Sequence, residues 1–409
     1  MYQQRPGRLW RLRWWLRRSL PALGPAFVAA IAYVDPGNVA TNVAAGGRFG
    51  YLLVWVVVVA NVMAMLIQYL SAKAGLATGL SLPALCREHL PRRVVGGLWL
   101  QAELVAIATD VAEVVGGALA LRLLFGLPLL TGGLITAGVA FALLLLKNRG
   151  HRPFEIAVTG MLGVILVGFA YDLVLGRPDV GALVGGSVPR FDGAASVVLA
   201  SAMLGATVMP HAIYLHSGLT AERAVGASEP RRRFLLRGQR VDVVVAMTLA
   251  GLVNLAMLVV AASMLRGHGD TIEAAHAALG EVAGRPAAVL FAVALLASGF
   301  AASSVGTLSG QLVMEGFLRR RLPLVLRRLV SLAPALVVLA VGVDPTKALV
   351  ASQGVLSLGI PFALVPLVLF TRRRDLMGAL VNRRLTTVVG GACAALVIAL
   401  NLALVGSLV

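Results

Sequence analysis

The amino-acid sequence predicts an all-α protein that crosses a membrane many times. Of its 409 residues, 59% are hydrophobic and only 13% are charged, and the mean hydropathy is +0.88. These values lie outside the composition of soluble domains. The apolar residues also gather in long runs of about 20 residues, which is the length that an α-helix needs to cross a bilayer.

We count eleven such apolar runs. They centre near Ile31, Val59, Val111, Val139, Val164, Leu204, Met257, Phe300, Val337, Pro361 and Leu396. When the connecting loops alternate between the two sides of the membrane, one side receives only the basic residues Arg48, Arg122, Arg177, Arg190, Arg266, Arg285 and Lys347. All the others among the 36 basic residues fall on the opposite side. Because cytoplasmic loops accumulate Lys and Arg, we expect the N-terminus in the cytoplasm and the C-terminus outside.

The first 20 residues differ from the rest of the chain. In residues 1–20, arginines alternate with three tryptophans, Trp10, Trp14 and Trp15. This pattern is typical of a short helix that lies on the membrane surface, so we expect residues 1–20 to be a cytoplasmic segment and residues 21–409 to be the membrane domain. The net charge of +18 is explained by these basic clusters between spans, and we expect no nucleic-acid partner. The two cysteines, Cys86 and Cys393, provide neither a disulfide framework nor a CxxC pair.

The first span is interrupted by the sequence Asp35-Pro36-Gly37-Asn38. In lipid, an unwound turn survives only where it lines a cavity enclosed by protein. An ionised aspartate at this depth costs at least about 2.5 kcal/mol, so a functional role is its first interpretation. The other interpretation is that Pro36 only kinks the helix and that Asp35 pairs with a basic residue.

The sixth span is interrupted in the same way, by Met209-Pro210-His211 after the small residues Gly205 and Ala206. Two broken helices at corresponding positions predict a transporter made of inverted repeats, with the substrate held at the breaks. We expect the repeats to be residues 21–175 and 194–371, with residues 384–409 forming an extra helix.

The residues at the two breaks offer ligands for a cation. Asp35 has a carboxylate, Asn38 an amide oxygen and Met209 a thioether, and the unwound segments free the carbonyls of Ala32 and Ala206. Oxygen ligands alone suit Mg²⁺ or Ca²⁺, whereas a sulfur ligand favours later divalent metals such as Mn²⁺, Fe²⁺, Co²⁺ or Cd²⁺. The alternative is that Met209 only fills space in the core.

The two interruptions also carry a resemblance to a family. The sequences DPGN at residues 35–38 and MPH at residues 209–211 closely resemble the two most distinctive motifs of the Nramp family (natural resistance-associated macrophage proteins), which are proton-coupled divalent metal transporters. The resemblance extends from about Leu23 to the end of the tenth span. It implies the inverted-repeat fold of leucine-type transporters, with helices 1 and 6 broken at mid-membrane.

The resemblance also implies a function and a set of ligands. The expected function is import of Mn²⁺ or Fe²⁺ with protons, by alternating access, across the cytoplasmic membrane of a bacterium. The substrate is the metal, and we expect neither a bound cofactor nor an obligate protein partner. By matching positions, the metal ligands are expected to be Asp35, Asn38, Met209 and the carbonyl of Ala206, and in particular conformations also Ala32 and Gln353.

The third span carries three acidic residues on one face. At 100° per residue, Glu103, Asp110 and Glu113 lie within about 80° of one another. A row of carboxylates along a membrane helix suggests a proton relay, with Arg327 and Arg328 as partners. In Nramp proteins, the matching acids and arginines form a route for protons that is separate from the metal path. The alternative is a static cluster of buried ion pairs.

Two histidines lie close to the second break. His211 and His216 have an ordinary pKa near 6.5, which suits proton movement or gating. They are five residues apart and therefore face different directions, so we expect at most one of them, His211, to border the metal path. We expect Asp35 to take part in the proton route as well.

Enzymatic chemistry is not indicated, because the sequence contains no HExxH, GxSxG or Walker A motif. Two alternative functions remain open. One is a leucine-type symporter for an amino acid or amine, although an aspartate and a thioether at the breaks disfavour an anionic substrate. The other is a membrane metal sensor that does not transport.

Overall fold

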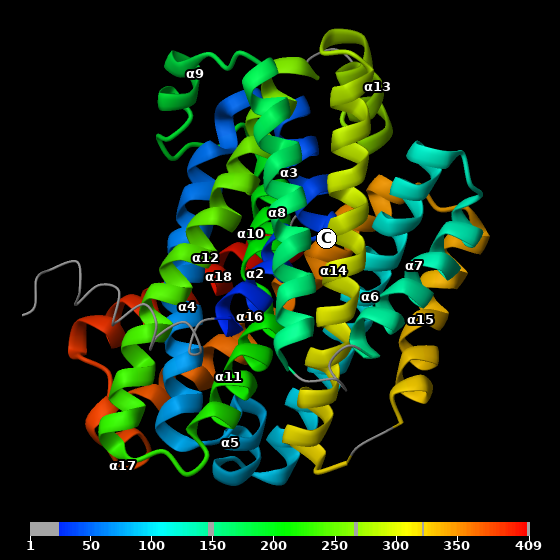
Figure 1. Cartoon of the computed structure of the whole chain (residues 1–409). Coiled ribbons are helices and arrows are strands. Elements are labelled where there is room, and N and C mark those ends of the chain that lie inside the picture. Colours follow the sequence, from blue (N-terminus) through cyan, green and yellow to red (C-terminus); the bar gives the residue numbers. More distant parts are fainter. Residues whose placement is uncertain (1–23, 146–150, 266–268, 321–322, 407–409) are drawn as a thin grey trace, which may run out of the picture.

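The computed structural model describes residues 24–145, 151–265, 269–320 and 323–406, and it shows a bundle of α-helices (Figure 1). In chain order the elements are α2 (Pro25–Ile31), η2 (Ala32–Val34), α3 (Pro36–Phe49), η3 (Gly50–Leu53), α4 (Val54–Thr78), α5 (Leu82–His89), α6 (Arg92–Phe125), α7 (Leu129–Leu145), α8 (His151–Leu175), α9 (Val180–Gly185), α10 (Gly193–Thr207), α11 (Pro210–Ala224), α12 (Glu229–Met264), α13 (Ile272–Val282), α14 (Arg285–Leu318), α15 (Leu324–Val341), α16 (Pro345–Thr371), α17 (Arg374–Met377), η5 (Gly378–Leu380) and α18 (Arg384–Gly406). The described residues contain no β-strand, so the predicted all-α class is confirmed.

Every predicted span centre falls within a helix of this list. Within the described ranges, eight helical segments are long and apolar enough to cross a membrane, and three shorter apolar helices cover Pro25–Val34, Leu129–Leu145 and Leu329–Val341. One of the eight, Pro36–Thr78, runs through α3 and α4. The count of eleven crossings and the repeat boundaries stay predictions. The predicted surface helix of residues 1–20 lies outside the described residues.

The connections alternate between the two ends of the bundle. Helices α9 and α13 lie at one end, and α5 and α17 lie at the other (Figure 1). Arg87 on α5 and Arg374 on α17 belong to the end that the sequence predicts to be rich in positive charge. Arg48 lies at the opposite end, where it contacts Asp270 just before α13. The side of the membrane that each end faces stays a prediction.

Apolar side chains cover the outside of the bundle, and many polar ones lie inside. On the outer surface, Val62 is 61% exposed and Leu402 is 69% exposed. Asp35, Asn38 and Gln353 are fully buried or nearly so. This distribution suits a protein surrounded by lipid, where buried polar groups mark function.

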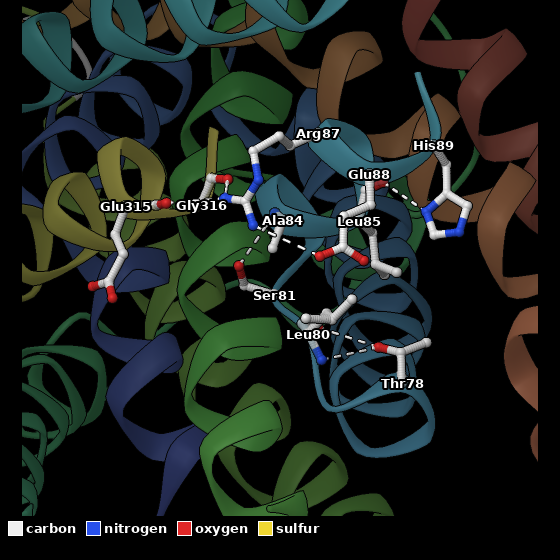
Figure 2. A network of polar contacts seen from close by, with 10 residues as sticks. All are labelled: Thr78, Leu80, Ser81, Ala84, Leu85, Arg87, Glu88, His89, Glu315 and Gly316. Carbon is white, nitrogen blue, oxygen red and sulfur yellow. Dashed lines mark hydrogen bonds and ion pairs between the residues drawn. The ribbon is translucent and has the colours of Figure 1, made fainter. Parts of the chain in front are cut away.

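The short helix α5 attaches the connection between α4 and α6 to the end of α14 (Figure 2). The Arg87 guanidinium donates to the backbone carbonyls of Glu315, at 3.1 Å, and of Gly316. These carbonyls lie in the last turn of α14, where the helix leaves its acceptors unpaired and favours a positive charge. The amide of Leu82 also donates to Ser217 Oγ of α11, at 2.9 Å. Helix α5 therefore links α11 and α14 at this end of the bundle.

Candidate functional site

The first break forms where η2 ends and α3 begins. Pro36 is the first residue of α3, and a residue that precedes proline is driven towards an extended backbone. Asp35 has this conformation, with φ −70° and ψ 169°. Its Oδ1 accepts one hydrogen bond from the backbone amide of Asn38, at 2.8 Å, and another from the side-chain nitrogen Nδ2 of Asn38, at 2.6 Å. Asp35 thus ends one half of the span and caps the other half.

The second break follows the same local chemistry. Helix α10 ends at Thr207, and Pro210 is the first residue of α11. Met209 precedes this proline and is extended, with φ −81° and ψ 126°. Its side chain is fully buried. The prediction that spans one and six are both interrupted is confirmed.

The two breaks meet inside the bundle. Asn38 Nδ2 donates to the carbonyl of Ala206 at 2.8 Å, across 168 residues of chain. Gln353 of α16 lies against the same place, because a Cβ added to Gly37 would lie only 1.8 Å from Gln353 Nε2. A side chain at position 37 would therefore force the Gln353 side chain to move away from the start of α3. The structure brings Asp35, Asn38, Ala206 and Gln353 together.

Three oxygen atoms at this meeting point are buried without a hydrogen-bond partner among the described residues. They are Asp35 Oδ2, Asn38 Oδ1 and Gln353 Oε1. A buried polar atom without a partner is costly and calls for an explanation such as a bound ion. The donor set fits a divalent cation, because it combines a carboxylate with neutral oxygens. The thioether of Met209 lies three residues beyond Ala206, at the same break, and would add a soft ligand.

The remaining predicted ligand, Ala32, begins η2 and is buried one turn before Asp35. No group of three or more His, Cys, Asp or Glu side chains with metal-binding geometry occurs within the described ranges. A site for metal at the breaks would therefore depend on mixed ligands around one carboxylate.

Neighbouring helices hold the freed carbonyls of the first break. Asn254 Nδ2 of α12 donates to the carbonyl of Tyr33 at 2.7 Å, and Ser298 Oγ of α14 donates to that of Val34 at 2.6 Å. Asn42 Nδ2 donates in turn to Asn254 Oδ1 at 3.1 Å. The sequence analysis did not single out these residues. The signal that could have found them is an amide or hydroxyl inside an otherwise apolar run.

One end of the acidic row on α6 is paired with α15. Arg327 donates two hydrogen bonds to the Glu103 carboxylate, at 3.3 and 3.1 Å. Its guanidinium also packs against Gly310 of α14, where an added Cβ would lie 2.2 Å from Nη2. The side chain of Arg328, the other predicted partner, lies outside the described part of the structure.

The other end of the row lies near the second break. Asp110 and Glu113 are both buried, and the Glu113 carboxylate packs against Gly306 of α14. The hydroxyl of Thr109, next to Asp110, lies 3.3 Å from Nδ1 of His211. His211 is the second residue of α11, so it lies between the break and the acidic row.

His216 belongs to different surroundings. Its Nδ1 lies 2.7 Å from Gln68 Oε1, and its Nε2 lies 3.1 Å from Gln239 Oε1. Gln68 Nε2 donates to the hydroxyl of Tyr33 at 2.7 Å. The expectation that the two histidines face different directions agrees with this geometry.

The N-terminus of α2 is capped by the carboxylate of an aspartate of α12. The Asp242 carboxylate accepts hydrogen bonds from the amide of Gly24, at 3.2 and 3.0 Å, and from the amide of Ala26, at 3.1 Å. A carboxylate at a helix N-terminus satisfies its unpaired amides. Beside it, Arg223 of α11 forms an ion pair of 2.8 Å with Glu155 of α8. This group of residues is not predictable from the sequence, because nothing in it indicates that groups from four different helices meet.

Comparison with known proteins shows which family this chain resembles. The family model described as "Natural resistance-associated macrophage protein-like" matches residues 26–407. The divalent metal cation transporter MntH of Mycobacterium leprae is 54% identical over 394 residues, which is 95% of this chain and 92% of that protein. MntH of Deinococcus radiodurans is 52% identical over 392 residues, covering 94% and 89% of the two chains.

Solved structures agree with the fold. A point mutant of the manganese transporter of Eremococcus coleocola superposes with a TM-score of 0.82 at 32% identity, covering 98% of this chain and 88% of that one. The nucleobase–cation symporter MHP1 superposes with a TM-score of 0.61 at 19% identity, over 94% of this chain and 89% of that one, which shows a shared fold alone. The predicted leucine-transporter-like fold is thereby confirmed. The chain is a multi-pass membrane protein that belongs to the Nramp family, a family of transporters and not of enzymes.

Proposed function

We propose that this protein imports divalent transition metal ions, Mn²⁺ or Fe²⁺, together with protons, across the bacterial cytoplasmic membrane by alternating access. The observation that carries the proposal is the group of unpartnered buried oxygens of Asp35, Asn38 and Gln353 where two broken helices meet. The names of the relatives, divalent metal cation transporters, support the metal part. The distribution of basic residues supports a cytoplasmic N-terminus and an external C-terminus.

The ligand set would act by replacing the water around the ion. Asp35 supplies the negative charge, and Asn38, Gln353 and the Ala206 carbonyl supply neutral oxygens. The side chains of Asp35 and Asn38 are already oriented by the hydrogen bonds of the break, so metal binding would cost little side-chain conformational entropy. A metal that binds at Asp35 would displace a proton held by this carboxylate or by a neighbouring group. Co-import requires that the displaced proton then leave towards the inside by a route of its own.

The proton route would lead away from the break along α6. His211 lies next to Thr109 and is followed by Asp110 and Glu113 and then by the pair of Glu103 with Arg327. These groups lie on a face of α6 that packs against α14 and α15. The route therefore differs from a path for the metal through the break itself.

The N-terminus of α2 is held by polar contacts with neighbouring helices. Asp242 of α12 accepts hydrogen bonds from this N-terminus, which lies beside the ion pair of Arg223 with Glu155. In our proposal, alternating access requires α2 to leave these contacts so that the ion can pass from the breaks to one side of the membrane. The polar contacts at its N-terminus would then act as a latch.

Purified protein in liposomes tests the proposal. With a Mn²⁺ indicator and a pH indicator inside the vesicles, an inward Mn²⁺ gradient is expected to produce metal uptake and acidification together. Vesicles without protein provide the control. Metal binding with no flux would support the sensor interpretation, and amino-acid uptake without metal uptake would support the alternative symporter.

Substituting Met209 tests the role of sulfur. In Met209→Ala, Ca²⁺ is expected to compete with Mn²⁺ about tenfold better than in the unchanged protein, because the remaining oxygens no longer favour the later metal. The measurement is Mn²⁺ uptake at increasing Ca²⁺ concentrations. Met203→Ala, another buried methionine of the same span, provides the matched control. Equal Ca²⁺ competition in Met209→Ala and Met203→Ala would show that the thioether does not select the metal.

Substituting Asp242 tests the latch. Asp242→Asn has one acceptor oxygen in place of two, so α2 is expected to open roughly tenfold more often. Ala29 of α2 is completely buried, and a cysteine introduced there reports the opening through its rate of thiol labelling. The same labelling without the introduced cysteine gives the background from Cys86 and Cys393. An unchanged labelling rate in the Asp242→Asn protein would exclude the latch.

A further inference from the structure

A groove lies between α8 and α12, on a side of the bundle away from the two breaks. Its volume is about 310 Å³, and only apolar residues line it. They include Leu166, Phe169 and Ala170 of α8 and Leu252, Ala256 and Val259 of α12. Leu252 is 52% exposed and Ala170 is exposed as well, so the groove is open on the outer surface of the bundle. In a membrane protein this surface faces lipid tails.

The upper end of the groove is the one nearest α9, a helix that lies at the top of the bundle in Figure 1. Pro178 and Leu183 close the groove at this end. The amide of the neighbouring Asp179 donates to the hydroxyl of Tyr51 at 3.3 Å, and Trp55 Nε1 donates to the carbonyl of Arg190 at 3.2 Å. Tyrosine and tryptophan with an apolar body and a bonded polar tip are typical of the membrane–water interface.

An arginine lies next to this end of the groove. Arg177 is exposed and directly precedes Pro178, which is part of the groove wall. Within the described ranges it has no ion pair or side-chain hydrogen bond. Its backbone is in the left-handed region, with φ +42°, which is unusual for any residue except glycine. Such a conformation is retained where the surrounding structure requires it, and here it occurs in the short connection between α8 and α9.

We infer that this groove binds a membrane phospholipid, with one acyl chain between α8 and α12 and the phosphate at Arg177. The apolar lining matches an acyl chain and excludes a polar ligand. A guanidinium is well suited to a phosphate, because it can donate two parallel hydrogen bonds. The aromatic residues at the upper end place the phosphate at the depth where headgroups lie.

A lipid bound in this groove would also contact the helix that supports the first break. The groove residues Val253 and Leu255 flank Asn254, whose amide holds the carbonyl of Tyr33 on the other side of α12. A lipid chain would therefore pack against the outer face of the same helical turn that supports the break.

Lipid binding to the intact purified protein can be measured by native mass spectrometry. The probes are phosphatidylglycerol and a diacylglycerol with the same acyl chains, which lacks the phosphate. Ala170→Phe places a ring in the groove from its exposed wall, and Val167→Phe adds the same ring to the lipid-facing surface of α8 outside the groove, where Val167 is 63% exposed. Arg177→Ala removes the cation, Arg177→Lys keeps the charge, and Arg190→Ala removes another exposed cation at the same end. Thermal unfolding of each variant verifies that it is folded.

The expected results differ between the variants. Ala170→Phe should weaken binding of both lipids at least about tenfold, and Val167→Phe should leave both unchanged. Arg177→Ala should weaken phosphatidylglycerol roughly tenfold without affecting diacylglycerol, with partial recovery in Arg177→Lys and no effect of Arg190→Ala. Equal binding by Ala170→Phe and Val167→Phe would overturn the groove as the site. Equal loss of the two lipids in Arg177→Ala, or no loss, would overturn the phosphate contact.

Discussion

Asp35→Asn is expected to lower the affinity for Mn²⁺ by roughly 100-fold or more while leaving the fold intact. Removal of a group that only orients a metal ligand typically costs about 10- to 100-fold, and Asp35 would be a direct ligand and the only acid at the breaks. Asparagine can still accept the hydrogen bond from the Asn38 amide, since both residues are good helix caps. Isothermal titration calorimetry with Mn²⁺ and thermal unfolding of the same preparation measure the two effects.

Asn38→Ala provides the comparison, because it removes one neutral oxygen and keeps the charge. Its loss of Mn²⁺ affinity should be clearly smaller than that of Asp35→Asn. If Asp35→Asn binds Mn²⁺ nearly as well as the unchanged protein, the metal is not held at the two breaks.

Asp110→Asn is expected to stop proton movement while Mn²⁺ binding is retained. Asp110 lies in the middle of the row on α6, and a carboxylate can take and release a proton, whereas an amide cannot. The ligands at Asp35, Asn38 and Met209 are not altered. Proton influx in liposomes should fall at least about tenfold, and the Kd for Mn²⁺ from calorimetry should change less than about threefold.

Asp172→Asn is a matched control for this experiment. Asp172 is another buried carboxylate in a membrane helix, α8, and it lies outside the acidic row. Its substitution should leave proton influx unchanged. If the row is only a static cluster of ion pairs, Asp110→Asn should instead lower the free energy of unfolding by roughly 3 to 5 kcal/mol and reduce both fluxes together. A stable Asp110→Asn protein with normal proton influx would contradict both interpretations.

The sequence predicts the two breaks well because their cause is local. A proline restricts the residue before it and lacks an amide hydrogen. Proline alone does not decide the outcome, because Pro334 of α15 and Pro361 and Pro366 of α16 lie inside continuous helices. At the first break, the side chain of Asp35 also caps the helix that begins at Pro36. The meeting of the two breaks was predictable only through the pattern of two matching interruptions. The hydrogen bond from Asn38 to Ala206 shows that they do meet.

The supporting contacts could not be predicted in the same way, because they join residues far apart in the chain. Asn254 holds the carbonyl of Tyr33 across 221 residues, and Asp242 caps the helix that begins at Pro25. A single amide or acid in an apolar run indicates that some partner exists, but only tertiary packing determines which one. The roles of the individual site residues accordingly stay proposals.

The two oxygens of Asp35 have different surroundings, and under the proposed function this difference limits which residues can occupy position 35. Oδ1 accepts hydrogen bonds from Asn38 at the start of α3, and Oδ2 has no hydrogen-bond partner among the described residues, so in the proposed function Oδ2 would bind the ion. A glutamate carries the same charge, but its extra methylene would move both oxygens away from the amide at the start of the helix. A carboxylate alone is therefore not enough at position 35. Any successful exchange of residue 35 has to preserve the length of the side chain as well as its charge, so Glu is a poorer replacement than its acidity suggests.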